Sequence, residues 1–263
     1  MNGRTRLAVT LLAFGYAFLY LPIVLVIVYS FNESRLVTVW AGFSLKWWKA
    51  LIENDAMLDA AWLSLRIGLA SATLSTLLGL AAGYVLARVP RFFGRTLFAS
   101  LVIAPMVMPE VVMGISMLLL FVGSDRIFGG PERGFLTITA AHVTFSMAFV
   151  AIVVQARLAD FDRSLEEAAM DLGATPWTVF FTVTLPLIAP ALASGWLLAF
   201  TLSLDDLILT QFVSGAQSQT LPMRVYSSVR LGVDPQINVL ATIVVAIAAC
   251  ALVVSGWLTR KRH

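Results

Sequence analysis

Six long apolar runs constrain this chain more than any other feature of its sequence. They cover approximately residues 7–29, 64–87, 97–122, 135–156, 187–212 and 238–259. Each run is long enough to cross a bilayer as an α-helix, which takes about 20 apolar residues. We therefore predict an all-α membrane protein with six transmembrane helices, in a single domain over residues 1–263.

The composition leaves little room for any other kind of structure. Of the 263 residues, 59% are hydrophobic and 13% are charged, whereas soluble domains average roughly 45–50% apolar and about 25% charged residues. The runs and their connections account for nearly the whole chain, so we expect no sizeable soluble domain. Apart from membrane lipid, any large partner must be a separate chain.

The basic residues predict the orientation of the helices. The first run exceeds the roughly 7–15 apolar residues of a signal peptide, so we interpret it as an uncleaved span. Six spans put both termini on one side, which holds ten of the 18 Lys and Arg residues. These ten are concentrated in short tails and connections, where positive charge marks the cytoplasmic side. Both termini and the 157–186 segment are therefore predicted to be cytoplasmic, and the scatter of the cations indicates no nucleic-acid partner.

The 157–186 segment has closely spaced helix start and stop signals. Ser164 and Glu167 have the S-x-x-E spacing of a capping box, which begins a helix. Gly173 suits the left-handed residue that follows the end of a helix. This pattern predicts a short helix that ends in a tight turn.

A second short helix is predicted directly after that turn. Thr175 is a suitable N-cap with Pro176 in the first turn, and we expect Pro186 to end the helix. The residues between them include Trp177, Val179, Phe180 and Phe181, which are too apolar for a free loop. The chain's own helix ends would cover part of this surface, and a short helix of this kind also suits a groove in a partner.

The same segment resembles the EAA loop of binding-protein-dependent ATP-binding-cassette (ABC) permeases. The resemblance rests on Glu167-Ala168-Ala169, Gly173 and Val183-Thr184-Leu185-Pro186, and on the place of the segment between the fourth and fifth of six spans. Val183 replaces the family's usual Ile, a mild departure. The resemblance implies the type I ABC importer permease fold and a loop that docks in a cleft of the ATPase. It assigns coupling to Glu167, Ala168, Ala169, Gly173, Leu185 and Pro186.

The chain itself is not expected to be an enzyme. A phosphate-binding loop needs G-x-x-x-x-G-K-[ST], but the lysines are Lys46, Lys49 and Lys261, and none follows a glycine. With two histidines and one cysteine, the chain offers no convincing catalytic or metal-ligand set. We predict no catalytic residue, no metal and no cofactor, and expect ATP hydrolysis in a partner subunit.

Three acidic residues in or at the ends of the apolar runs are candidates for the transport pathway. They are Glu110, Asp205 and Asp206, and no Lys or Arg lies as deep. Charge in a membrane is costly and marks functional positions, so an acidic pathway suits a cationic substrate. The alternatives are structural, because either aspartate could cap a broken helix and Glu110 could pair with a partner subunit.

Several blocks of the chain also resemble the second permease of polyamine importers, and most of all that of the putrescine system. They include Ala104-Pro-Met-Val-Met-Pro109-Glu110 and Leu202-Ser-Leu-Asp205-Asp206-Leu. The resemblance implies a polyamine substrate and alternating access in a bacterial inner membrane. It also implies a sister permease in a heterodimer, an ATPase dimer and a periplasmic binding protein. Trp196 is then a candidate for cation–π contact with the substrate, or else a packing residue.

Two other functions remain open on the sequence. The same kind of permease could carry Fe³⁺ or sulfate. The chain could also be a secondary transporter or channel that uses Glu110 and Asp205 as an ion relay.

Small residues recur every four positions in the second run. Ser71, Ser75, Gly79 and Gly83 form a strip on one helical face, and such strips let helices approach closely. We predict packing against a helix of this chain or of a partner. His142, in the fourth run, is expected to make a hydrogen-bonded helix contact, with a proton relay as the alternative.

Overall fold

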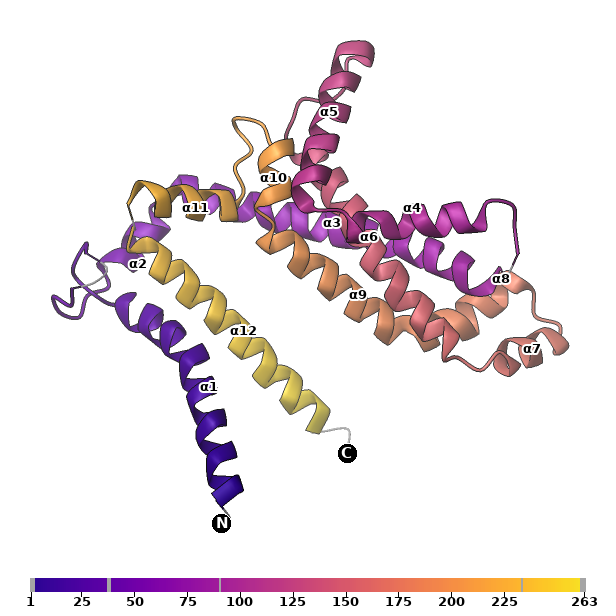
Figure 1. Cartoon of the computed structure of the whole chain (residues 1–263), viewed down its shortest axis with the longest axis horizontal. Helices are drawn as coiled ribbons and strands as arrows, with labels where there is room; N and C mark the ends of the chain where they lie inside the picture. The colour runs from indigo at the N-terminus through magenta and orange to yellow at the C-terminus, as the bar shows by residue number, and fades with distance from the viewer. Residues whose placement is uncertain (1–2, 37–38, 90, 233, 261–263) are drawn as a thin grey trace. The chain divides into compact units, whose positions relative to one another are not determined.

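The structure is a computed structural model that describes the backbone of residues 3–36, 39–89, 91–232 and 234–260 (Figure 1). All regular elements over these residues are helices. Lys261 and Arg262, two of the cations used to predict topology, lie outside the described residues.

The helices follow one another along the chain with short connections. They are α1 (Gly3–Tyr29), α2 (Lys46–Ile52), α3 (Asp55–Arg88), α4 (Arg95–Val107), α5 (Glu110–Phe128), α6 (Phe135–Ala159), α7 (Ser164–Asp171), α8 (Pro176–Val179), the π-helix η1 (Phe180–Thr184), α9 (Leu185–Asp205), α10 (Ile208–Val213), α11 (Leu221–Leu231) and α12 (Gln236–Arg260).

The chain divides into two compact units, which are described separately. One contains residues 1–59 and 224–263, and the other contains residues 60–223. In the first unit α12 packs against both α1 and α2, and Asn54 Nδ2 donates a 2.9 Å hydrogen bond to Gln236 Oε1. The prediction of one domain over residues 1–263 stays a prediction.

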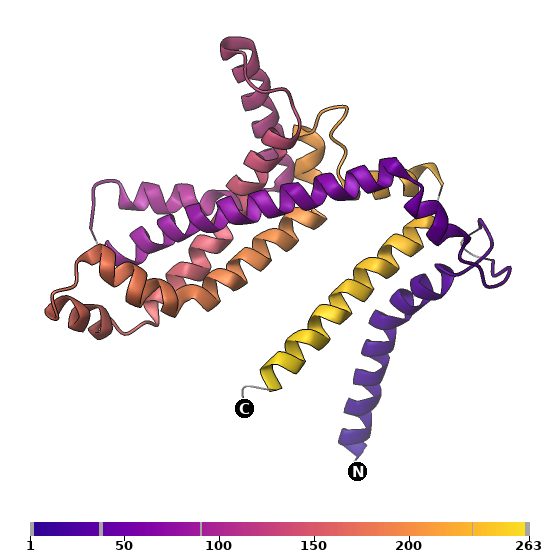
Figure 2. The ribbon, with the colours of Figure 1, turned by 180° about the vertical axis from the view of Figure 1, so that it is seen from behind.

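In the second unit α3, α6 and α9 run side by side (Figures 1 and 2). Their contact is the core of the unit, with buried side chains from all three helices: Ala72, Val150, Val154, Leu158, Ile188 and Ala199. A second cluster lies toward α5 and α10 and contains Ile67, Met113, Ile138, Ala141, Leu209 and Val213. α6 contributes to both clusters and is the most buried of the long helices.

The strip of small residues on α3 packs against α6 and α9, as the sequence predicts for a helix of this chain. A Cβ atom on Gly79 would lie 2.6 Å from Val150 Cβ, and one on Gly83 would lie 2.6 Å from the carbonyl oxygen of Ala151. Ser71 Oγ donates a 3.0 Å hydrogen bond to Ser203 Oγ of α9. The backbones of α3 and α6 approach this closely because the residues of the strip have small side chains or none.

The third predicted span, 97–122, is wrong as a single helix. α4 ends at Val107, Met108 is extended (φ −73°, ψ 139°), and α5 begins at Glu110. Pro109 has no N–H to donate and disfavours helical dihedrals in the residue before it, so the helix stops at this point. Pro109 therefore separates two helices.

The fifth predicted span, 187–212, is also interrupted. α9 ends at Asp205, Asp206 is extended (ψ 124°), and α10 begins at Ile208. The backbone N–H groups of Leu209 and Thr210 donate to the Asp206 carboxylate at 3.3 and 2.7 Å. Asp206 therefore satisfies the first free N–H groups of α10, which makes the break stable. The alternative that an aspartate caps a broken helix is confirmed for Asp206.

The predicted helix stop at Pro186 is wrong, because residues Pro176–Asp205 form one continuous helix. Residues Phe180–Thr184 make a π-turn directly before α9, and Pro186 lies in the first turn of α9. A proline ring clashes with the carbonyl four residues earlier in a regular helix. A π-turn changes that geometry, and we infer that it lets the helix continue past the proline.

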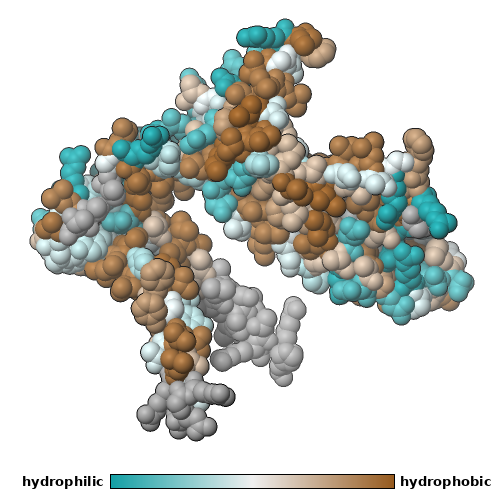
Figure 3. Space-filling model, viewed as in Figure 1, coloured by the Kyte–Doolittle hydropathy of each residue, from teal (hydrophilic) through white to brown (hydrophobic). Residues whose placement is uncertain are grey.

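Five helices in the described residues are long and apolar enough to cross a membrane: Leu7–Tyr29, Asp55–Arg88, Glu110–Phe128, Phe135–Ala159 and Pro176–Asp205. α12 covers the sixth predicted run. Large apolar side chains lie on the surface of these helices (Figure 3), for example Phe18, which is 72% exposed, and Leu119, which is 67% exposed. Surfaces of this kind are covered by lipid or by another chain.

The close approach of α3 and α6 gives a first prediction. Gly83→Leu should lower the thermal unfolding temperature of the detergent-solubilised protein, because the new side chain meets the α6 backbone and overpacking costs about 1–3 kcal/mol. Gly123→Ala is the matched control, since a Cβ on Gly123 has no neighbour within 4 Å. Equal unfolding temperatures for the Gly83 variant and the wild type would contradict the close packing.

Candidate functional site

Residues 157–186 form the candidate coupling segment, a pair of short helices at one end of α3, α6 and α9 (Figure 1). The first is α7. The second begins with α8 and passes through η1 into α9, so the segment joins directly to a long helix. α7 packs on α8 and η1.

The turn between the two helices forms as predicted. Gly173 has φ +87°, the left-handed conformation that glycine adopts without strain. Its N–H donates to the Met170 carbonyl at 2.9 Å, and the Ala174 N–H donates to the Ala169 carbonyl at 3.1 Å. This pair of bonds is a Schellman motif, which satisfies the last carbonyls of α7.

The start of α8 is also as predicted. Pro176 occupies the first turn, and the Thr178 N–H donates to Thr175 Oγ1 at 3.3 Å. The Thr175 side chain therefore caps the helix.

The predicted capping box at the start of α7 is wrong. Ser164 is already helical, and its N–H donates to Asp162 Oδ1 at 3.0 Å. Hydrogen bonds from the backbone and side chain of Ser164 lower the pKa of Asp162 from its ordinary value. The Asp162 side chain therefore accepts the first free N–H of α7, and Glu167 is exposed.

The exposed side of α7 carries an apolar stripe, which consists of Leu165, Ala168, Ala169 and Leu172. These positions follow the i, i+3, i+4, i+7 spacing of one helical face. Leu165 is 49% and Leu172 90% exposed, and Ala168 is exposed between them. An uncovered apolar stripe with small residues at its centre suits insertion into a groove of another protein.

An adjoining face of α7 is held by an ion pair that sequence reasoning missed. Arg88 Nε, at the end of α3, lies 3.1 Å from Glu166 Oε2, and the two side chains are 9% and 13% exposed. Its N–H is not well directed at the carboxylate, so the contact is an ion pair rather than a hydrogen bond. Thr184 Oγ1 of η1 donates to Glu166 Oε1 at 2.6 Å. In the sequence, Arg88 is one of the ten basic residues on the predicted cytoplasmic side, and the family resemblance assigns coupling to Glu167, the neighbour of Glu166.

The remaining positions of the predicted coupling set lie nearby in the chain but differ in exposure. Leu185 is half-buried at the start of α9, and Pro186 is exposed in the same turn. Thr184, directly before them, is buried.

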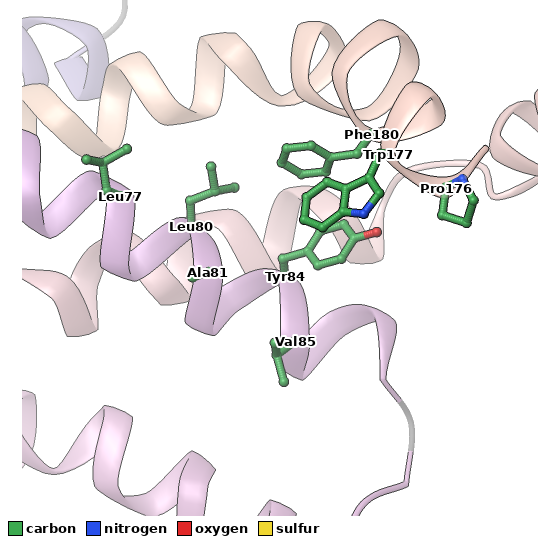
Figure 4. Close-up of a pocket in the computed structure, with 8 residues that line it drawn as sticks. All are labelled: Leu77, Leu80, Ala81, Tyr84, Val85, Pro176, Trp177 and Phe180. Atoms are coloured by element: carbon green, nitrogen blue, oxygen red, sulfur yellow. The ribbon is translucent and has the colours of Figure 1, made fainter. Parts of the chain in front are cut away.

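An apolar pocket of about 550 Å³ lies between α3 and the start of the second short helix. Figure 4 shows Tyr84 of α3 together with Trp177 and Phe180. The Tyr84 and Phe180 rings meet edge to face, with centroids 5.3 Å apart. Trp177 is 75% exposed, so this surface too is only partly covered by the chain itself.

The acidic pathway candidates lie on different elements. Glu110 is exposed as the first residue of α5, where the positive end of the helix dipole favours a carboxylate. Asp205 is exposed as the last residue of α9. Both therefore lie at helix breaks, not within continuous spans.

Asp206 belongs to a buried polar network centred on His142. Its Oδ2 lies 3.2 Å from His142 Nε2, and His142 Nδ1 lies 2.7 Å from Ser203 Oγ. Thr210 Oγ1 lies 2.9 Å from His142 Nε2 and donates to Asp206. Since Ser71 donates to Ser203, the network joins α3, α6, α9 and α10. His142 thus makes the predicted hydrogen-bonded helix contact.

Trp196 makes two contacts within the unit. Its indole N–H donates to Thr73 Oγ1 at 3.1 Å, and its ring stacks on Phe200 with centroids 5.3 Å apart. Phe200 therefore covers part of the ring surface that a cation–π contact with a substrate would use.

The family model and two of the most similar relatives found by comparison with known proteins all describe membrane components of transport systems. A family model described as binding-protein-dependent transport system inner membrane component matches residues 75–261. The putrescine transport system permease protein PotI of Escherichia coli (strain K12) is 54% identical over 242 residues, which are 92% of this chain and 86% of that protein. The spermidine/putrescine transport system permease protein PotC of the same strain is 40% identical over 94% of this chain and 91% of that protein.

Solved structures share the fold at lower identity. A chain of a bacterial ABC transporter involved in the import of the acidic polysaccharide alginate superposes with a TM-score of 0.74 at 17% identity, over 99% of this chain and 98% of that chain. A chain of the MetNI methionine ABC transporter superposes with a TM-score of 0.58 at 18% identity, over 76% of this chain and 92% of that chain. With a family model that matches most of the chain and relatives of this identity, the chain belongs to the family of binding-protein-dependent transport system inner membrane components.

Proposed function

We propose that the chain is a transmembrane permease subunit of an ATP-driven polyamine importer, with putrescine as the substrate. The observation that carries this proposal is the 54% identity to the putrescine permease PotI over 92% of the chain. The fold alone does not select the substrate, because an importer of an acidic polysaccharide has the same fold. The long shared sequence therefore decides between polyamine and the alternatives Fe³⁺ and sulfate.

The chain would form half of a translocation pathway with a sister permease, in the type I importer fold. An ATPase dimer would hydrolyse ATP, and a periplasmic binding protein would deliver the substrate. The apolar surface of the long helices supports a second membrane subunit beside lipid. The orientation of the chain in the membrane would follow the distribution of its Lys and Arg residues, with both termini and the candidate coupling segment in the cytoplasm of a bacterial cell.

The candidate coupling segment would be the EAA loop that docks the ATPase. Its apolar stripe on α7 is exposed, while Glu166 on an adjoining face of the helix is tied to the rest of the unit. A short helix that is attached through one face and exposes an apolar stripe on another has the geometry of a helix-in-groove contact. The family resemblance of Glu167, Ala168, Ala169 and Gly173 supports the same docking role.

Glu110 and Asp205 are the favoured pathway residues. Each is an exposed carboxylate beside a helix break in an apolar chain, and a charge at such a position is costly unless a partner or ligand neutralises it. A diamine carries two ammonium groups that suit this role. Asp206 and Trp196 have structural partners within the chain, so we place them beside the pathway and not as its main contacts.

The proposed function is tested by reconstitution. In proteoliposomes that contain the chain, its sister permease and the ATPase, binding protein loaded with putrescine should stimulate ATP hydrolysis several-fold and drive uptake of radiolabelled putrescine. Spermidine is measured in parallel, and sulfate and Fe³⁺ serve as control substrates. Absence of stimulation by any polyamine would remove the substrate assignment. Uptake driven by an ion gradient without the ATPase would instead favour a secondary transporter.

The acidic pathway is tested by neutralisation. Glu110→Gln and Asp205→Asn should each lower putrescine uptake about tenfold, as expected for a lost charge interaction of about 1.4 kcal/mol, with the complex still assembled. Glu132→Gln, at an exposed residue between α5 and α6, is the matched control and should transport normally. Wild-type uptake in both pathway variants would show that neither carboxylate meets the cation.

A further inference from the structure

The ion pair between α3 and α7 lies where several elements of the second unit meet. Arg88 is the last residue of α3, and Glu166 is in the first turn of α7. Arg88 Nη1 also donates to the Leu158 carbonyl, near the end of α6, at 3.2 Å. Thr184, which donates to Glu166, directly precedes α9. One buried contact therefore connects α7 with the ends of α3, α6 and α9.

Burial makes this contact stiff. The two charged side chains are 9% and 13% exposed, so neither can exchange its partner for water at low cost. Separation of the pair leaves an uncompensated buried charge. The two helices are therefore expected to move together and not to slide past each other.

The rest of the last two turns of α3 supports the same arrangement. Tyr84, one turn before Arg88, contacts Phe180 of η1 edge to face. Arg163 Nη2, at the start of α7, donates to the Ala87 carbonyl at 3.1 Å. Both short helices of the candidate coupling segment are thus held against one end of α3.

The polypeptide connection from α7 to α9 contains two elements that are less rigid than a regular helix. It passes through the Gly173 turn, where a Cβ would have no neighbour within 4 Å. It then passes through the π-turn Phe180–Thr184, whose hydrogen bonding departs from the regular helix. A push on α7 therefore reaches the long helices more directly through Glu166 than along the chain.

We propose that Arg88 and Glu166 are positioning residues for transport, and that their ion pair is the joint through which movement of α7 passes to α3, α6 and α9. This inference rests on the proposed function, because it requires an ATPase that moves α7. In this proposal the apolar stripe receives the force from the ATPase, and Glu166, on an adjoining face of α7, passes it to Arg88. Neither residue contacts the substrate.

The test measures putrescine imported per ATP hydrolysed in the reconstituted importer, together with co-purification of the ATPase. Arg88→Gln and Glu166→Gln should each lower this ratio on the order of tenfold or more, with the ATPase still bound. The double variant should be no worse than the more affected single variant, because the two residues act as one unit. Arg91→Gln and Asp160→Asn, exposed charges at the same end of the unit, should keep the wild-type ratio.

Three results would overturn the inference. Either single variant could keep the wild-type ratio of putrescine to ATP, or the reductions in this ratio could multiply in the double variant. The third result is a folded permease that no longer binds the ATPase. If Glu166→Gln does not fold, Thr184→Val takes its place as the test variant, since it removes only the hydrogen bond to Glu166. It should lower the ratio with the complex intact, and a wild-type ratio would overturn the inference. If the wild-type importer showed no ATP-driven putrescine uptake, the proposed function itself would be rejected. If the wild-type importer worked and the variants kept its ratio of putrescine to ATP, only the proposed role of the Arg88–Glu166 ion pair would be rejected.

Discussion

The close contact of α3 with α6 is the interaction on which the rest of the second unit depends. Gly79 and Gly83 bring the two backbones so near that a single Cβ would collide with α6. Helices in a membrane gain little from hydrophobic burial against one another, so tight packing through small residues has to hold them. α9 also packs against α6, so the three long helices form one packed layer.

Polar contacts hold this layer near its two ends. Toward α10, the network of Ser71, Ser203, His142 and Asp206 connects the layer to the break between α9 and α10. At the other end, Arg88 and Glu166 attach α7. Both clusters are buried, so separating the groups of either one would leave buried polar or charged atoms without their partners, which is costly. The packed layer thus lies between the proposed docking helix and the helix breaks that carry Asp205 and Asp206.

Local signals in the sequence predicted much of this structure. Apolar length found the helical segments, and Gly173, Thr175 and Pro176 gave the turn between the short helices, because each acts through its own backbone geometry. The four-residue spacing of the small strip predicted tight packing, although it could not identify α6 as the neighbour. The apolar runs by themselves do not reveal the breaks at Pro109 and Asp206, because an apolar run has the same composition whether it is one helix or two. Pro186 was misjudged because a π-turn is not visible in sequence.

The roles of the acidic residues are also only partly predictable from local sequence. Glu166 and Glu167 are adjacent and chemically alike, and only the fold reveals that Glu166 is paired with Arg88 while Glu167 is exposed. A partner 78 positions away in the chain leaves no local pattern. Asp206, in contrast, is a candidate helix cap on the sequence alone, because a short carboxylate can accept hydrogen bonds from the free N–H groups at the start of a helix.

In the proposed function, the apolar stripe of α7 is the surface that binds the ATPase. A photoreactive amino acid in place of Leu172, the most exposed residue of that stripe, tests it in the assembled, transport-competent importer. Irradiation should link the chain to the ATPase, while the same probe in place of Leu119, exposed on α5, should not. A link to the ATPase from position 119, or none from position 172, would contradict the account.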